Sequence, residues 1–185
     1  MNRKAIALWL LVAAGLAGCS GREVYKDPAA EVEDRVEDLL GRMTLEEKVM
    51  QVTQWTYGKN MNVNNVESET KAVSPMIGSL LYRSTSPAYY NRIQRKAVEE
   101  SRLGIPILFG HDVIHGFRTT YPISLAQACS WNPGLVEKAA GVAAQEARMS
   151  GVDWTFSPMI DVARDPRWGR VAEGYGDCLL YTSDA

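Results

Sequence analysis

The sequence predicts an α/β fold in which a parallel sheet is covered by helices. Apolar runs at residues 76–82, 105–109 and 152–160 alternate along the chain with segments of helical periodicity. These runs are continuous, whereas a strand with one solvated face alternates between apolar and polar residues. Strands that are buried on both faces and separated by helices are typical of βαβ units, so we expect a parallel sheet.

The first two helices are predicted from apolar spacing. From Glu31 onward, apolar residues recur at helical intervals until Gly41, which we expect to end the helix. The run Thr44-Leu45-Glu46-Glu47 is a capping box, because a threonine hydroxyl and the glutamate three residues later can each accept a backbone N–H. A second helix is therefore expected from Thr44 to about Gln54. The polar, Asn-rich residues 59–74 then predict a loop.

The later helices are predicted from their end signals. Ser86-Pro87 combines an N-cap with a proline at the first helical position, and Gly104 ends that helix. Asn132-Pro133 starts another, alanine-rich helix in the same way, and Gly151 ends it.

The N-terminal segment indicates export. Two basic residues precede an uncharged apolar run at residues 5–17, which is shorter than the ~20 residues that a membrane-spanning helix needs. We interpret residues 1–18 as a signal peptide. The run closes with LAGC, which resembles a bacterial lipobox, so we expect lipidation of Cys19 and a lipoprotein in the periplasm or at the outer membrane. Residues 19–30 would form a polar tether.

Composition argues against a nucleic-acid partner. The 185 residues include 20 Lys and Arg against 22 Asp and Glu, which gives a net charge of −2 and no basic stripe. Beyond Cys19, the chain has Cys129 and Cys178, which allow at most one disulfide. Stability must therefore come from packing.

Charged and aromatic residues gather after two of the predicted strands. Residues 110–118 follow the second run, and residues 164–170, RDPRWGR, follow the third. Ligand-binding groups of parallel sheets collect beyond the carboxyl ends of the strands. Guanidinium donors beside a flat tryptophan suit a sugar, which offers both hydroxyls and C–H faces. The alternative is an ion pair between Asp165 and Arg167 that flanks a turn at Pro166.

The stretch HDVIH at residues 111–115 superficially resembles the HExxH pattern of zinc proteases. That pattern places both histidines on one face of a helix, whereas this segment follows a predicted strand. In an extended chain, residues four apart are separated by about 13 Å at ~3.3 Å per residue, too far to share one ion. We therefore expect no metal site and interpret His115 as a hydrogen-bonded loop anchor.

Asp112 is the candidate binding residue of this stretch. A carboxylate at the end of an apolar strand is costly to bury unless hydroxyls or cations satisfy it. Adjacent hydroxyls of a sugar would do so. The alternative is a salt bridge to a nearby arginine such as Arg118.

Two long motifs carry a family resemblance. GHDVIHGFRTTYPISLAQA, residues 110–128, and FSPMIDVARDPRWGRVAEGYG, residues 156–176, resemble the N-terminal barrel domain of glycoside hydrolase family 3, and within it the bacterial periplasmic β-glucosidases. The resemblance implies that residues 31–177 are the N-terminal part of that domain. They would supply the first three or so βα units of a (β/α)8 TIM-type barrel.

The resemblance also assigns site residues. It implies that Asp112 and Arg170 contact the terminal sugar and that Glu173 orients the Arg170 guanidinium. His115 and Trp168 would support the site, Trp168 either lining the pocket or packing beneath it. The implied activity is hydrolysis of terminal β-D-glucosyl residues from a β-glucoside or oligosaccharide, with retention of configuration and without metal or cofactor. The alternatives are a β-xylosidase or β-N-acetylglucosaminidase of the same fold, and a noncatalytic sugar-binding lipoprotein.

The chain departs from the family pattern after Gly176. Residues 178–185, CLLYTSDA, replace the expected acidic segment, and their back-translation resembles a transposon adapter, so we interpret them as a non-native tail. A complete barrel takes about 250 residues. In the family the nucleophilic aspartate and the acid/base glutamate lie further along, so the chain as given is expected to be inactive.

Overall fold

The computed structural model describes residues 23–56, 73–81 and 87–177. The predicted signal peptide, Cys19 with its lipid, most of the predicted loop at 59–74 and the predicted non-native tail lie outside the described residues. The chain divides into two compact units, one ending at Thr44 and one beginning at Leu45, and each is described by itself.

The first unit consists of a short 3-10 helix and one α-helix. The 3-10 helix η1 spans Val24–Lys26, inside the stretch predicted to be a tether, and α2 spans Val32–Arg42. Asp38 of α2 joins them, because its carboxylate accepts the backbone N–H of Tyr25 at 3.1 Å and the Nε–H of Arg42 at 2.9 Å. The prediction that Gly41 ends the helix is wrong by one residue, since α2 continues to Arg42.

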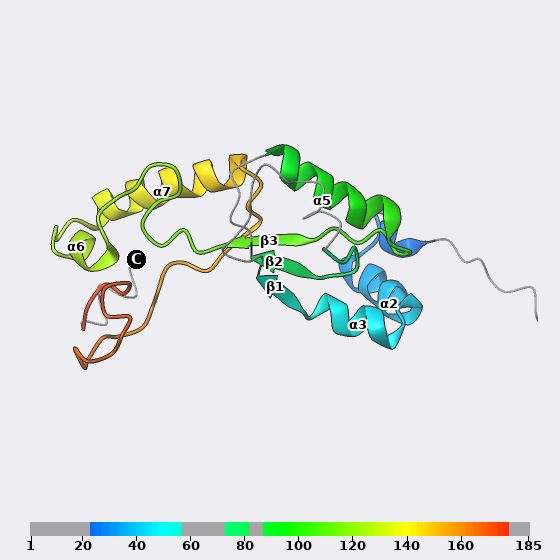
Figure 1. Ribbon diagram of the computed structural model, residues 1–185, viewed down its shortest axis with the longest axis horizontal. Helices are drawn as coiled ribbons and strands as arrows, with labels where there is room; N and C mark the ends of the chain where they lie inside the picture. Colours follow the sequence, from blue (N-terminus) through cyan, green and yellow to red (C-terminus); the bar gives the residue numbers. More distant parts are fainter. Residues whose placement is uncertain (1–22, 57–72, 82–86, 178–185) are drawn as a thin grey trace, which may run out of the picture. The chain divides into compact units, whose positions relative to one another are not determined.

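The second unit is built on a parallel sheet, as predicted. Its strands run in the spatial order β1-β2-β3-β4, all parallel; Figure 1 shows β1, β2 and β3 side by side. The strands are β1 Gln54–Thr56, β2 Ser79–Leu81, β3 Leu108–His111 and β4 Trp154–Thr155. They are shorter than the predicted runs, and β1 was not predicted at all. A three-residue strand directly after a helix carries too few residues to show a period.

Helices precede β1 and separate β2 from β3 and β3 from β4. They are α3 Leu45–Gln51, α5 Pro87–Glu100, α6 Ser124–Ala128 and α7 Pro133–Met149. The predicted starts of α5 and α7 are correct, and Asn132 caps α7 by accepting the backbone N–H of Leu135 at 3.1 Å. The second predicted helix ends at Gln51, three residues early, and the short helix α6 was not predicted. No helix in the described ranges is long and apolar enough to cross a membrane.

The core lies between the central strands and α5. Leu80 of β2, Phe109 of β3 and Ile93 of α5 are all fully buried. Gln94 fastens α5 to the segment before β3, because its side chain accepts the N–H of Ile107 at 2.8 Å and donates to its carbonyl at 3.0 Å. The outer strands β1 and β4 are exposed. The buried central strand β3 therefore ends directly before Asp112 and positions it at the edge of the sheet.

Glu47 is buried and forms an ion pair with Arg102. The Arg102 Nε–H donates to its Oε1 at 3.0 Å. This residue of the predicted capping box thus joins α3 to the segment that follows α5.

Candidate functional site

The loop that follows β3, residues 112–121, carries Asp112 and is closed on itself. His115 closes it, because its Nδ1–H donates to the carbonyl of Tyr121 at 3.0 Å while the Tyr121 N–H donates to the His115 carbonyl at 2.8 Å. Gly116 has a φ of 121°, and a Cβ there would clash with the carbonyl oxygen of Thr119. Only glycine fits such a turn without strain. His115 is therefore the loop anchor that the sequence indicated.

The zinc pattern has no geometric basis here. His111 ends β3, and its Nδ1 accepts the N–H of Val113 at 3.3 Å, so the segment is not helical. The His111 ring packs edge-on against Phe117, with centroids 5.1 Å apart. Within residues 23–56, 73–81 and 87–177, no group of three His, Cys, Asp or Glu side chains is arranged to hold a metal ion.

Glu146 of α7 holds the tip of this loop. Its Oε2 accepts the backbone N–H of Arg118 at 2.9 Å and of Thr119 at 2.8 Å, and its Oε1 accepts the Thr119 hydroxyl at 2.7 Å. The hydrogen bond from the Thr119 backbone, followed by the one from its hydroxyl, lowers the pKa of the Glu146 carboxyl. No pattern in the sequence singled out Glu146.

The segment after β4 holds the other end of the loop. The Thr155 hydroxyl donates to the Asp112 carbonyl at 3.3 Å, and the Ser157 hydroxyl donates to the Val113 carbonyl at 3.0 Å. The sequence analysis also missed these two residues. A hydroxyl in a strand has no signature of its own, so only the register of β3 against β4 identifies its partner.

The loop that follows β4, residues 161–177, carries Arg170 and is held mainly by its own residues. The Ala163 N–H donates to the Gly176 carbonyl at 2.9 Å and closes the loop. The Arg170 guanidinium grips Glu173, with Nη2 and Oε2 2.7 Å apart, and also donates to the Met159 sulfur at 3.4 Å. The contact between Glu173 and Arg170 that the family resemblance implied is therefore present.

The other arginine pair of this loop lies in solvent. Arg167 donates to Asp165 through its backbone N–H at 2.9 Å and through its guanidinium, and the Arg167 side chain is 88% exposed. Trp168 is half-buried, and its N–H donates to the Asp165 carbonyl at 3.0 Å, so it continues the same turn. The Asp165–Arg167 ion pair, which the sequence offered as the alternative to sugar binding by this stretch, is thus present.

Asp112 and Arg170 lie close enough to interact electrostatically. Glu173 is the main cause that raises the pKa of Arg170, and the carboxylates of Asp161 and Asp112 raise it further. Among the residues that the structure describes, no ion pair joins Asp112 to Arg118, and the contact of Arg118 with Glu146 is made by its backbone N–H. The side chains of Asp112 and Arg170 are both exposed. A carboxylate acceptor and a guanidinium donor thus lie on loops that follow adjacent parallel strands at one edge of the sheet.

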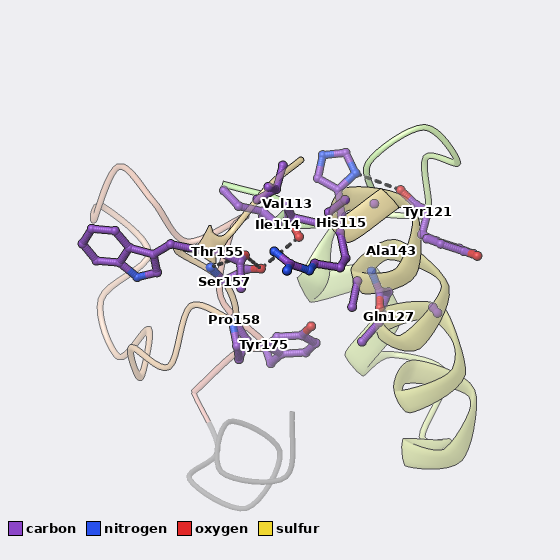
Figure 2. A pocket seen from close by; sticks show the side chains of 18 of the residues that line it. Val113, Ile114, His115, Tyr121, Gln127, Ala143, Thr155, Ser157, Pro158 and Tyr175 are labelled. Atoms are coloured by element: carbon purple, nitrogen blue, oxygen red, sulfur yellow. Dashed lines mark hydrogen bonds between the residues drawn. The ribbon is translucent and has the colours of Figure 1, made fainter. Parts of the chain in front are cut away.

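A cavity of about 370 Å³ lies beside this edge, between loop 112–121, β4 and α7 (Figure 2). Alanines of α7 form one wall, and His115, Tyr121, Thr155 and Tyr175 lie around it. Neither Asp112 nor Arg170 lines it. The cavity is therefore not the sugar position that these two residues would define.

Comparison with known proteins identifies related chains. Residues 44–183 match the family described as Glycosyl hydrolase family 3 N terminal domain. A periplasmic beta-glucosidase of Salmonella typhimurium is 37% identical over 148 residues, which cover 80% of this chain and 19% of that protein. A beta-xylosidase of Formosa agariphila is 32% identical over 127 residues, 62% of this chain and 18% of that protein. The chain thus spans about a fifth of the length of these relatives.

Solved structures give the same picture. The structure of a beta-glucosidase from Listeria innocua superposes with a TM-score of 0.70 at 39% identity, over 84% of this chain and 22% of that one. The same enzyme in complex with glucose superposes with a TM-score of 0.70 at 38% identity, over 83% of this chain and 23% of that one.

Proposed function

Because the chain belongs to glycoside hydrolase family 3, we propose that it is the N-terminal part of a longer enzyme that hydrolyses terminal, non-reducing β-D-glucosyl residues of β-glucosides or oligosaccharides. Its similarity to several beta-glucosidases supports this choice. The observation that carries the proposal is the electrostatic proximity of Asp112 and Arg170 on loops that follow adjacent parallel strands.

In this proposal the two side chains bind one sugar from different directions. The Asp112 carboxylate accepts hydrogen bonds from adjacent hydroxyls, and the Arg170 guanidinium donates to another oxygen of the same ring. Glu173 fixes the guanidinium in one orientation before the sugar arrives. Binding energy of this kind accelerates hydrolysis when it is greater in the transition state than in the ground state.

We further propose that the sheet is the first part of a (β/α)8 barrel. The support is its topology, because the parallel strands lie in sequential order, with helices between β2 and β3 and between β3 and β4. Retaining hydrolysis needs two carboxyl groups about 5–5.5 Å apart, one as nucleophile and one as acid/base. We place both beyond this chain, so the chain alone binds sugar weakly at most and does not hydrolyse it.

The second candidate is a β-xylosidase, which the Formosa agariphila relative favours. A xylosyl residue differs from a glucosyl residue at C6, so the discriminating contacts are those to the hydroxymethyl group. The third, a noncatalytic sugar-binding protein, would keep Asp112 and Arg170 and lack the nucleophile.

Export and lipidation complete the proposal. The name of the Salmonella typhimurium relative places that protein in the periplasm, which supports export of this one. We propose that Cys19 carries the lipid that anchors it. Mass spectrometry of the mature N-terminus would show diacylglycerol on Cys19, and a soluble mature protein with unmodified Cys19 would contradict the anchor.

The experiment that tests the function uses the full-length protein. We expect it to hydrolyse an aryl β-glucoside with a kcat/KM above those for the aryl β-xyloside and β-N-acetylglucosaminide, and to release β-glucose first by NMR. The 185-residue chain is the matched control and should show no turnover. Preferred hydrolysis of the xyloside would favour the second candidate, and glucose binding without hydrolysis would favour the third.

A further inference from the structure

Two hydroxyl groups at the end of β4 contact the backbone that carries Asp112. The Thr155 hydroxyl donates to the Asp112 carbonyl at 3.3 Å, and the Ser157 hydroxyl donates to the next carbonyl, that of Val113, at 3.0 Å. The two hydroxyls are also 2.9 Å apart, and the Ser157 N–H donates to the Thr155 hydroxyl oxygen at 3.2 Å. Figure 2 shows Thr155 and Ser157 beside Val113.

The register of the sheet explains why these hydroxyls meet that backbone. Thr155 is paired with His111 across the β3–β4 ladder, so the chain after Thr155 runs alongside the chain after His111. In an extended segment residues two apart point to the same side, which places Thr155 and Ser157 together. Phe156 points the other way and packs on Gly110, where an added Cβ would lie 2.6 Å from its ring.

The backbone of Asp112 needs such support. Val113 has a φ of 48°, which is unusual for a β-branched residue, so the chain turns sharply directly after Asp112. The Glu146 anchor lies at the other end of the loop, six or seven residues further along. The Thr155 and Ser157 hydroxyls reach the carbonyls of Asp112 and Val113, which lie on either side of this turn.

We propose that Thr155 and Ser157 are positioning residues that act through Asp112, because their hydroxyls fix the backbone turn that aims its carboxylate at the sugar. The inference rests on the proposed function, in which Asp112 binds that sugar. It also links the two loops, since the strand that supports Asp112 leads directly into the segment that carries Arg170.

A double-mutant cycle in the full-length protein tests this. Thr155→Val removes the hydroxyl and keeps the shape, Ser157→Ala removes the other, and Thr155→Ser is the matched control that keeps the hydroxyl. Each is made in the wild-type and in the Asp112→Ala background. The readouts are the Kd for glucose by calorimetry and kcat/KM for an aryl β-glucoside.

We expect Thr155→Val and Ser157→Ala each to weaken both readouts about tenfold, as for a lost hydrogen bond near a charged group, while Thr155→Ser stays within about twofold. In the Asp112→Ala background the same changes should have no further effect. Equal losses in both backgrounds, or no loss in the wild type, would overturn the inference. General misfolding would give equal losses in both backgrounds, so it counts against the inference.

The proposed function can fail separately. A wild-type protein that binds glucose without hydrolysing it would contradict the glycosidase, and the glucose cycle would still decide the role of the two hydroxyls. A wild-type protein with no affinity for glucose would contradict both.

Discussion

Both loops at the sheet edge are closed by hydrogen bonds of their own, but they differ in their other support. Loop 112–121 depends on distant partners, because Glu146 lies 27 and 28 residues from its contacts and the partners of Thr155 and Ser157 lie 43 and 44 residues away. Loop 161–177 depends on near neighbours, with ion pairs two and three residues apart and a closing hydrogen bond between Ala163 and Gly176. The position of Asp112 is thus set by the tertiary structure, and that of the Arg170 guanidinium mainly by its own loop.

The difference suggests a division of roles. Contacts between distant residues form only when the sheet and α7 are in place, so the position of Asp112 depends on the folding of the whole second unit. Contacts between near neighbours can form early and survive local rearrangement. Substitutions at matched positions in the two loops can therefore separate the two kinds of support.

The largest effect is expected where both loops meet the sugar. Asp112→Ala and Arg170→Ala in the full-length protein should each lower kcat/KM for an aryl β-glucoside at least about 100-fold, because a hydrogen bond to a charged group is worth about 1.5–3 kcal/mol and each side chain makes more than one. Steady-state kinetics measures this. A variant with near-wild-type turnover would remove that residue from the site.

A pair of glycines compares the rigidity of the loops directly. Gly116→Ala forces a side chain into a left-handed turn against Thr119 and should cost about 1–3 kcal/mol of stability. Gly169→Ala meets nothing within 4 Å in the second loop and should change stability by less than about 0.5 kcal/mol. Urea denaturation measures both. Equal effects would show that the first loop adapts as easily as the second.

The two ion pairs within loop 161–177 should differ in their effect on activity. Glu173→Gln removes the charged partner of the Arg170 guanidinium. It should lower kcat/KM about tenfold, which corresponds to the loss of one charge-assisted hydrogen bond. Asp165→Asn breaks an exposed pair of similar geometry and is the control, with a change of less than about twofold. Comparable losses would mean that the whole loop, rather than the guanidinium, is being disturbed.

The anchor of the first loop gives a pH-dependent effect. The pKa of Glu146 lies below its ordinary value of 4.5, so its stabilising contacts are fully present above pH 4.5 and are lost as the pH falls through the lower folded-state value. Glu146→Gln should lower the unfolding temperature near pH 7, and the difference from wild type should shrink below pH 4.5. A difference that stays constant across this range would show that the carboxylate charge does not hold the loop.

The sequence predicted those parts of the molecule that depend on local pattern. The parallel sheet, the starts of α5 and α7 and the His115 anchor all follow from residues close together in the chain. The place of Asp112 after an apolar strand indicated it as a binding residue, and the resemblance to the family added Arg170 and the Glu173–Arg170 contact.

The missed parts share a physical cause. β1 and α6 are too short to show a period, and α3 gives way to β1 because pairing with β2 competes with continuation of the helix. Glu146, Thr155 and Ser157 bind partners that only the folded register brings near. Their residue types are ordinary for a helix face and a strand, so no pattern in the chain could have singled them out.

A crystal structure of the full-length protein with glucose tests the central claim most directly. We expect one sugar ring to lie within hydrogen-bonding distance, about 2.7–3.2 Å, of both the Asp112 carboxylate and the Arg170 guanidinium. Glucose bound elsewhere, for example in the cavity beside α7, with these two side chains directed at separate regions, would contradict the account.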